Sequence, residues 1–177
     1  MMLVCLDTHI LIWGVLGQAK ATQQEMIDRA QRFLRSLDKE KARVLIPPTV
    51  VAELVWKVPE ERHPEVLRVL QQRFVLGVLD AAGACLSAAI ARKNDGAVKG
   101  APGRETIRSD CQLVAVAVAY KAEKIYSNDP DIKRLAQGFV QVEELPNIPE
   151  QQKLFPARPS EPQSRHRADP STGEDQA

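Results

Sequence analysis

Short apolar runs alternate with segments of helical periodicity through the first 146 residues, and this alternation limits the possible fold more than any other feature. Apolar runs that end at a polar residue or a proline are typical of buried strands. The expected strands cover residues 2–6, 44–46, 74–79, 124–127 and 140–142. Strands that alternate with helices predict a three-layer α/β/α domain around a central, mainly parallel sheet of four to five strands.

Helices are expected in the segments between these strands, where apolar residues recur at helical spacing. The expected helices cover residues 10–16, 21–41, 49–58, 64–73, 80–93, 109–122 and a short segment from 129. Thr49 and Asp80 are expected N-caps, and Ser109 with Gln112 at N3 has the pattern of a capping box. Valines alternate within 109–122 and also permit a strand there, but the alanines between them favour a helix.

The composition changes after Pro146. Six of the twelve prolines lie between Pro146 and Pro170, and apolar residues become sparse. We therefore expect a folded domain over residues 1–146 and a Pro-rich, disordered tail over residues 147–177.

The net charge argues against nucleic-acid binding by an overall positive surface. The chain has 24 Lys plus Arg against 23 Asp plus Glu, so any nucleic-acid binding requires a local basic patch. Cys5, Cys85 and Cys111 lie in apolar stretches without a CxxC pair, which predicts reduced core thiols in a cytoplasmic protein. The sequence shows no secretory signal and no apolar run of about 18 residues, so no membrane segment is expected.

Four acids are expected at the same edge of the predicted sheet. Asp7 follows the first strand, Asp129 lies just past the fourth, and Glu53 is expected in the first turn of the helix after the second strand. Ligand sites of parallel sheets lie beyond the carboxyl ends of the strands. Asp110, expected in the first turn of its helix, joins them only if the loop 94–108 returns the chain to this edge.

Four carboxylates in a small volume repel one another, and a divalent cation relieves that repulsion. Oxygen ligands suit Mg²⁺ or Mn²⁺, and such a site can activate water for phosphodiester hydrolysis. Each acid also has a structural alternative. Asp7 and Asp129 can serve as N-caps, whereas Glu53 and Asp110 can interact with helix dipoles. Capping and metal binding are compatible.

Four segments, taken in order, resemble the PIN-domain family and most closely the VapC-like toxins of toxin–antitoxin pairs. They read Leu-Asp-Thr-His, Val-Ala-Glu-Leu, Ser-Asp-Cys-Gln-Leu-Val-Ala-Val-Ala and Ser-Asn-Asp-Pro-Asp-Ile. The resemblance covers about residues 1 to 145, and the order and spacing of the segments carry it. It implies a three-layer α/β/α fold and an endoribonuclease dependent on Mg²⁺ or Mn²⁺. It also implies a homodimer that a cognate antitoxin protein neutralises.

The resemblance also assigns roles to residues. The family's catalytic and metal-holding acids match Asp7, Glu53, Asp110 and Asp129. Asp131 matches a further acid that can assist the metal, and Thr8 and Ser127 match hydroxyl positions that support the acids. His9 and Asn128 lie beside these positions and are candidates to support the acids or to contact the substrate. For His9 the alternative is a structural or solvated histidine.

The chain departs from the family's commonest pattern at three places. His9 stands where Asn is commonest, while Ser127 and Ile132 replace Thr and Phe of the last motif. The loop before Asp110 is long. These departures bear on the choice of substrate more than on the metal site.

Basic residues before Asp110 are candidates for holding RNA phosphates, with a solvated loop as the alternative. These are Lys93, Lys99, Arg104 and Arg108. The basic run at Arg29, Arg32, Arg35 and Lys39 is interrupted by acids and is expected to be a surface stripe. Trp13 and Trp56 occupy apolar helical positions, which favours packing in the core or a subunit interface.

Two alternative functions fit parts of the pattern. A haloacid-dehalogenase-like phosphatase also places an Asp after the first strand, but it requires a second Asp at the position of His9. The other alternative is a catalytically inert PIN-like module that only binds RNA. The presence of all four acids argues against it.

Overall fold

The structure is a computed structural model that describes residues 2–94 and 104–149. Its centre is a five-stranded parallel sheet with the order β3-β2-β1-β4-β5. The strands are β1 (Leu3–Leu6), β2 (Arg43–Ile46), β3 (Val75–Leu76), β4 (Lys124–Tyr126) and β5 (Gln141–Glu143). The prediction of a mainly parallel sheet is confirmed.

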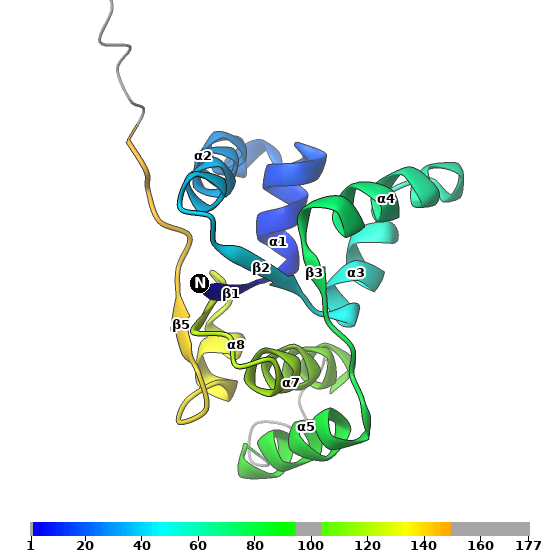
Figure 1. The fold of residues 1–177 in the computed structure, drawn as a ribbon, viewed down its shortest axis with the longest axis vertical. Helices are drawn as coiled ribbons and strands as arrows, with labels where there is room; N and C mark the ends of the chain where they lie inside the picture. The colour runs from blue at the N-terminus through cyan, green and yellow to red at the C-terminus, as the bar shows by residue number, and fades with distance from the viewer. Residues whose placement is uncertain (1, 95–103, 150–177) are drawn as a thin grey trace, which may run out of the picture.

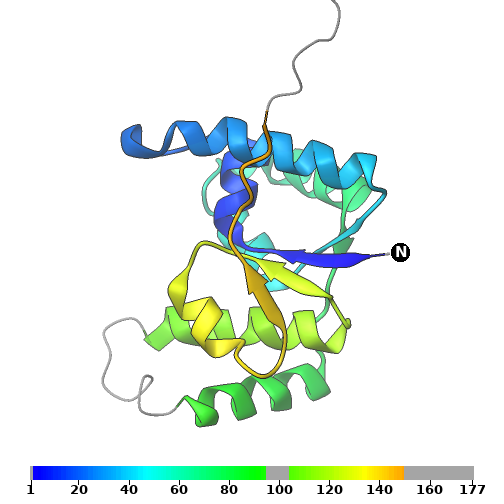
Figure 2. The ribbon, with the colours of Figure 1, turned by 90° about the vertical axis from the view of Figure 1, so that its left-hand side faces the viewer.

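Helices cover both faces of the sheet. The N-terminal half contributes α1 (Thr8–Leu11), the π-helix η1 (Ile12–Leu16), the 3₁₀-helix η2 (Ala21–Gln23), α2 (Glu25–Lys39), α3 (Pro48–Val55), the 3₁₀-helix η3 (Glu60–Arg62) and α4 (His63–Arg73). The C-terminal half contributes α5 (Ala81–Lys93), α7 (Arg104–Ala119) and α8 (Pro130–Leu135). Helices α1 to α4 lie on one face, α7 and α8 on the other, and α5 packs outside α7 (Figures 1 and 2). The three-layer α/β/α prediction is confirmed.

The core lies on both faces of the sheet, between the strands and the helices α1 to α4 on one side and α7 on the other. The inner residues of β1, β2 and β4 are buried. Residues 113–117 of α7 are buried as well, because a helix that packs between the sheet and α5 is apolar on nearly all sides. This packing resolves the helix-or-strand ambiguity of the valine pattern in favour of a helix.

Two expected helix starts are wrong. α3 begins at Pro48, not after Thr49, because a proline needs no N–H partner at the first helical position. The Thr49 hydroxyl is buried and has no hydrogen-bond partner among the described residues. α7 begins at Arg104, so Ser109 lies inside the helix and is not its N-cap. The expected cap at Asp80 is confirmed, since its carboxylate accepts from the Gly83 N–H at 2.7 Å.

Some other expectations change with the tertiary structure. The third strand is shorter than predicted, at Val75–Leu76. Trp13 is buried, but Trp56 is 80% exposed, so its expected packing in the core of the chain is wrong. Cys5 and Cys111 are buried, whereas Cys85 is exposed on the outer helix α5.

The predicted C-terminal tail lies almost wholly outside the described residues, which end at 149. Ile148 packs against the core, next to α2. No helix in the described part of the chain is long and apolar enough to cross a membrane.

Candidate active site

The candidate site lies at the carboxyl edge of the sheet, where β1 and β4 end side by side. Their register pairs Leu6 with Tyr126, and the Asp7 N–H continues the ladder to the Tyr126 carbonyl at 3.1 Å. The starts of α1, α7 and α8 lie on the same side of the molecule (Figure 2). The strand register therefore places the residues after Leu6 and Tyr126 next to one another.

Asp7 is 5% exposed and is held by two donors. Its Oδ1 accepts from the Thr8 N–H at 2.6 Å, and its Oδ2 accepts from the Ser127 hydroxyl at 2.9 Å. Ser127 Oγ in turn accepts from the Asp129 N–H at 3.0 Å. Asp129 Oδ1 then caps α8 by accepting from the Asp131 N–H at 2.8 Å. Asp7 and Asp129 thus act as N-caps, and hydrogen bonds through Ser127 link them to each other.

Glu53 connects three helices. Its Oε2 accepts from the Thr8 hydroxyl in α1 at 2.6 Å, and its Oε1 accepts from the Ser109 hydroxyl in α7 at 3.3 Å. Because α3 starts at Pro48, Glu53 is in the second turn and not in the first as expected. The role of Ser109 was missed, since its sequence context reads as a helix cap.

Asp110 is in the second turn of α7, not in the first, because that helix begins earlier than expected. It is 8% exposed, and its Oδ2 is buried without a hydrogen-bond partner among the described residues. The pKa of Asp110 is raised to about 7, first by burial and then by the nearby charges of Asp129, Asp7, Glu53 and Asp131. Asp110 therefore lies in the electrostatic field of the other acids.

The donor set suits a hard divalent cation. It consists of carboxylates and hydroxyls, and the buried Oδ2 of Asp110 is an oxygen that lacks a partner. In the part of the chain that the structure describes, no three acid, His or Cys side chains lie in a geometry that could hold a metal ion as they stand. Binding would therefore require rotation of carboxylate side chains within the cluster.

His9 and Asn128 border the acids in different ways. The His9 side chain is 61% exposed, and its Nδ1 lies 3.7 Å from Asp7 Oδ2. The nearby Asp7 carboxylate raises the pKa of His9, and the charges of Asp129 and Glu53 add to this, while partial burial opposes it. Asn128 Oδ1 accepts from the Leu145 N–H at 2.8 Å, so this side chain fixes the C-terminal segment.

The structure supports the basic candidates for RNA contact less well than it supports the clustering of the acids. Lys93 donates to the Gln137 carbonyl at 3.0 Å and lies over the Phe139 ring. Arg108 is exposed in α7. Arg104 begins that helix, its side chain is not described, and Lys99 lies outside the described residues.

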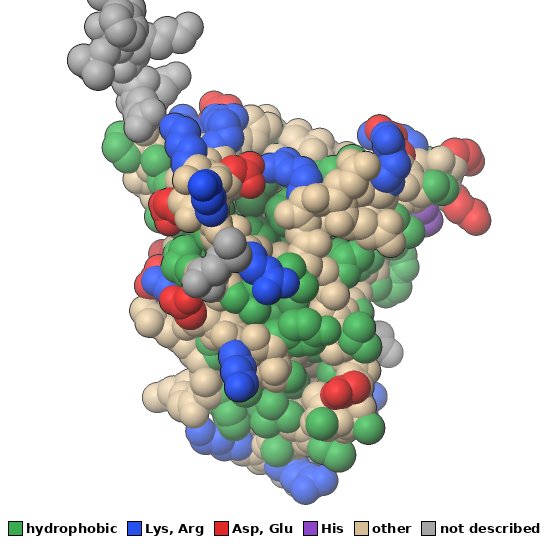
Figure 3. All heavy atoms as spheres, viewed as in Figure 1, with side chains coloured by type: hydrophobic (Ala, Val, Ile, Leu, Met, Phe, Trp, Pro, Cys, Tyr) green, Lys and Arg blue, Asp and Glu red, His purple; other side chains and the backbone are tan. Residues whose placement is uncertain are grey.

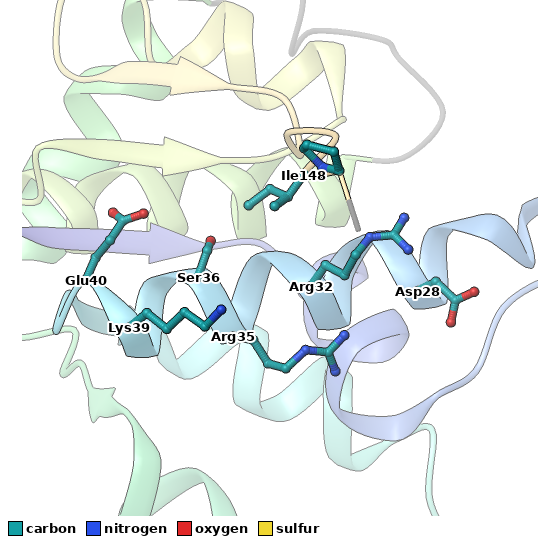
Figure 4. A pocket seen from close by; sticks show the side chains of 8 residues that line it. Asp28, Arg32, Arg35, Ser36, Lys39, Glu40 and Ile148 are labelled. Atoms are coloured by element: carbon teal, nitrogen blue, oxygen red, sulfur yellow. The ribbon is translucent and has the colours of Figure 1, made fainter. Parts of the chain in front are cut away.

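A separate cavity of about 530 Å³ lies on the outer face of α2 and shares no residue with the acids (Figure 4). It is lined by Asp28, Arg32, Arg35, Ser36, Lys39, Glu40, Ile148 and Pro149. Basic and acidic side chains are mixed over the α2 region of the surface (Figure 3), as expected for a surface stripe. Two arginines of the run, Arg29 and Arg32, are half-buried, and Arg29 Nη2 donates to the Leu145 carbonyl.

Comparisons with solved structures agree with this architecture. VapBC2 from Rickettsia felis, bound to a promoter DNA fragment, has a TM-score of 0.58 at 18% identity over 81% of this chain and 98% of that chain. VapBC-1 from nontypeable Haemophilus influenzae has a TM-score of 0.58 at 12% identity over 81% and 98%. DNA-bound VapBC from Salmonella typhimurium has a TM-score of 0.56 at 15% identity over 82% and 99%.

Sequence comparison identifies the family. No curated protein matches the chain in sequence. The family model described as PIN domain, however, matches residues 4–138, which include all five acids of the site. PIN domains are generally nucleases and typically use divalent metals. The chain therefore belongs to the PIN-domain family.

Proposed function

We propose that this protein is an endoribonuclease that hydrolyses RNA phosphodiester bonds with Mg²⁺ or Mn²⁺, as the toxin of a type II toxin–antitoxin pair. The observation that carries the proposal is the Asp110 carboxyl group. It is buried among four other acids, and its Oδ2 has no partner among the described residues. Burying a carboxylate without a partner costs free energy, and a bound cation would remove that cost.

Asp7, Glu53, Asp110 and Asp129 are the residues that would hold the metal, with Asp131 in support. Asp131 already forms an ion pair with Arg134 at 2.8 Å on the surface, which suits an assisting role. When bound, a divalent cation supplies a polarised water and neutralises charge on the phosphate.

The protein's own hydroxyls orient the acids. Thr8, Ser109 and Ser127 each donate to one carboxylate, and each bond leaves further lone pairs of that carboxylate for a ligand. Among the described residues, Asp110 Oδ2 receives no such bond, so its lone pairs are left for the metal ion. One of the four acids would serve as general base toward the attacking water. The burial of Asp7 and Asp110 keeps bulk water away from their oxygens.

An RNA cleavage assay tests this proposal. Purified protein is incubated with single-stranded RNA and Mn²⁺ or Mg²⁺, and Asp7→Asn and Asp110→Asn are compared with wild type. We expect cleavage by wild type to fall by about 100-fold or more in both variants and to stop with EDTA. Asp38→Asn is a matched control, because Asp38 is exposed and pairs with Arg73 in a different region. Full cleavage by both site variants would refute the proposal.

The toxin assignment is supported by structural similarity to the VapBC and FitAB proteins. We propose that a cognate antitoxin protein covers the acidic site and that the toxin acts as a cytoplasmic homodimer. Expression of the chain alone should arrest growth, and co-expression of the product of an adjacent short reading frame should restore it. Light scattering of the purified chain reports the dimer.

The two alternatives make different predictions. The phosphatase alternative requires an aspartyl-phosphate on Asp7 and a second Asp at position 9, where this chain has His9. The PIN-domain match also disfavours it. An inert RNA-binding module would bind RNA without cleaving it at any metal concentration.

A further inference from the structure

The His9 ring stands out beside the acids because it is exposed where its neighbours are buried. Asp7 and Thr8, directly before it, are 5% and 4% exposed, while the His9 side chain is 61% exposed. His9 lies in α1, one residue past the residue whose hydroxyl binds Glu53. An imidazole ring is thus presented to solvent at the rim of the acidic cluster.

A second ring lies against His9. Trp13 is four residues further along the chain, and the two ring centroids are 5.6 Å apart with an interplanar angle of 41°. Trp13 is 4% exposed and is fixed in the core. It belongs to the π-helix Ile12–Leu16, a conformation that is rare and frequently occurs at functional sites. The rear of the His9 ring is therefore held by a buried aromatic side chain.

Support of Asp7 alone does not explain this arrangement. Asp7 Oδ2 already accepts a hydrogen bond from Ser127 at 2.9 Å, whereas His9 Nδ1 lies 3.7 Å away. A histidine that only positioned Asp7 would gain from burial, because a polar contact is stronger away from water. Contact with a ligand would explain why this face of the His9 ring is exposed.

We propose that His9 forms a stacking site for an unpaired nucleobase of single-stranded RNA, next to the phosphate that is cleaved. The inference rests on the proposed ribonuclease function. Proteins recognise single-stranded RNA by stacking its bases on aromatic side chains, and an anchored ring loses little freedom on binding. Stacking tolerates any base, so the site selects unpaired RNA and not a particular base.

A double-mutant cycle between protein and RNA tests the proposal. Binding of a fluorescent single-stranded RNA of about 12 nucleotides is measured by anisotropy in EDTA, so that no cleavage occurs. A set of RNAs carries one abasic nucleotide at each position in turn. For wild type, one abasic position should weaken binding about tenfold. His9→Ala should weaken binding of the intact RNA about tenfold, and the same abasic position should then have no further effect.

Three controls separate stacking from indirect effects. His9→Phe keeps an aromatic face without a polar atom and should bind like wild type. His63→Ala removes a half-buried histidine that contacts the Val58 carbonyl and should leave RNA binding unchanged. Mn²⁺ binding to His9→Phe, measured by calorimetry, should match wild type, which shows that the acids are undisturbed.

The contradicting outcomes are distinct. The proposal is overturned if His9→Ala binds like wild type, if it weakens binding without any coupling to a base, or if His9→Phe is as weak as His9→Ala. If wild type cleaves RNA but shows no such coupling, only the stacking proposal is rejected. If wild type neither binds nor cleaves RNA, the ribonuclease proposal is rejected as well.

Discussion

The Ser127 hydroxyl donates a hydrogen bond to Asp7 Oδ2 at a distance of 2.9 Å. The same hydroxyl oxygen accepts from the Asp129 N–H at 3.0 Å, so one small side chain joins the ends of β1 and β4. The parallel register that pairs Leu6 with Tyr126 makes this contact possible, because it brings the following residues to the same level. The proximity of Asp7 and Asp129 is thus a product of strand register.

Ser127→Ala tests this coupling. Loss of the hydroxyl leaves the buried Asp7 Oδ2 with one fewer donor and the Asp129 N–H without its acceptor. We expect the free energy of unfolding to fall by about 1–3 kcal/mol and cleavage to slow by at least tenfold. Urea unfolding and single-turnover cleavage measure the two effects. Ser36→Ala is the matched control, because Ser36 bonds only to the Phe33 carbonyl of its own helix. Equal behaviour of the two variants would contradict the proposed role of Ser127.

Two threonines allow a closely matched comparison near Glu53. The Thr8 hydroxyl donates to Glu53 Oε2 at 2.6 Å, whereas the buried Thr49 hydroxyl has no partner in the described part of the chain. Thr8→Val should lower the free energy of unfolding by about 1–3 kcal/mol and impair cleavage, because the carboxylate loses a donor. Thr49→Val should be neutral or stabilising, since it removes a buried hydroxyl without a bond. Thermal melting of both variants gives the comparison, and greater damage from Thr49→Val would refute it.

The raised pKa of Asp110 predicts a pH-dependent stability. The folded group titrates at about 7, above its ordinary value of 3.8, so the folded state binds the proton more tightly. Stability of the metal-free protein should therefore fall as the pH rises between these values and level off above pH 7. Asp110→Asn removes the charge and should be more stable than wild type by about 1–3 kcal/mol at alkaline pH, with little difference near pH 4. Urea unfolding in EDTA across this range tests it, and a constant difference would show that Asp110 is not the titrating group.

Arg29 links α2 to the C-terminal segment by donating from Nη2 to the Leu145 carbonyl. Arg29→Met keeps the aliphatic stem and removes this donor, so the free energy of unfolding should fall by about 1–2 kcal/mol. Arg35→Met is the control on the same helix, because Arg35 is exposed and lines the cavity beside α2. Hydrogen exchange at the amides of Leu145, Asn147 and Ile148 should rise in the first variant alone. Unchanged exchange there would show that Arg29 does not anchor the segment.

The strand-end acids were predictable, and the helix-borne acids were predictable only in part. Asp7 follows an apolar run directly and Asp129 lies just past the end of another, so a parallel sheet leaves their positions little freedom. Glu53 and Asp110 depend on where α3 and α7 begin, and both helices start before the polar residues that resemble caps. The Ser109 contact with Glu53 follows from the packing of α3 on α7, which no local pattern encodes. Trp56 likewise has an apolar helical position, but it is the residue that follows α3, and the described part of the chain leaves its side chain 80% exposed.

Calorimetric titration of Mn²⁺ into the full chain tests most directly whether the clustered carboxylates hold a divalent cation. Wild type and the Asp38→Asn control should bind with the same affinity. Asp7→Asn and Asp110→Asn should each lose that affinity by about tenfold or more, and lowering the pH below 7 should weaken binding by wild type as Asp110 takes up a proton. Undiminished Mn²⁺ binding by Asp110→Asn, or no binding by wild type at neutral pH, would contradict the metal site.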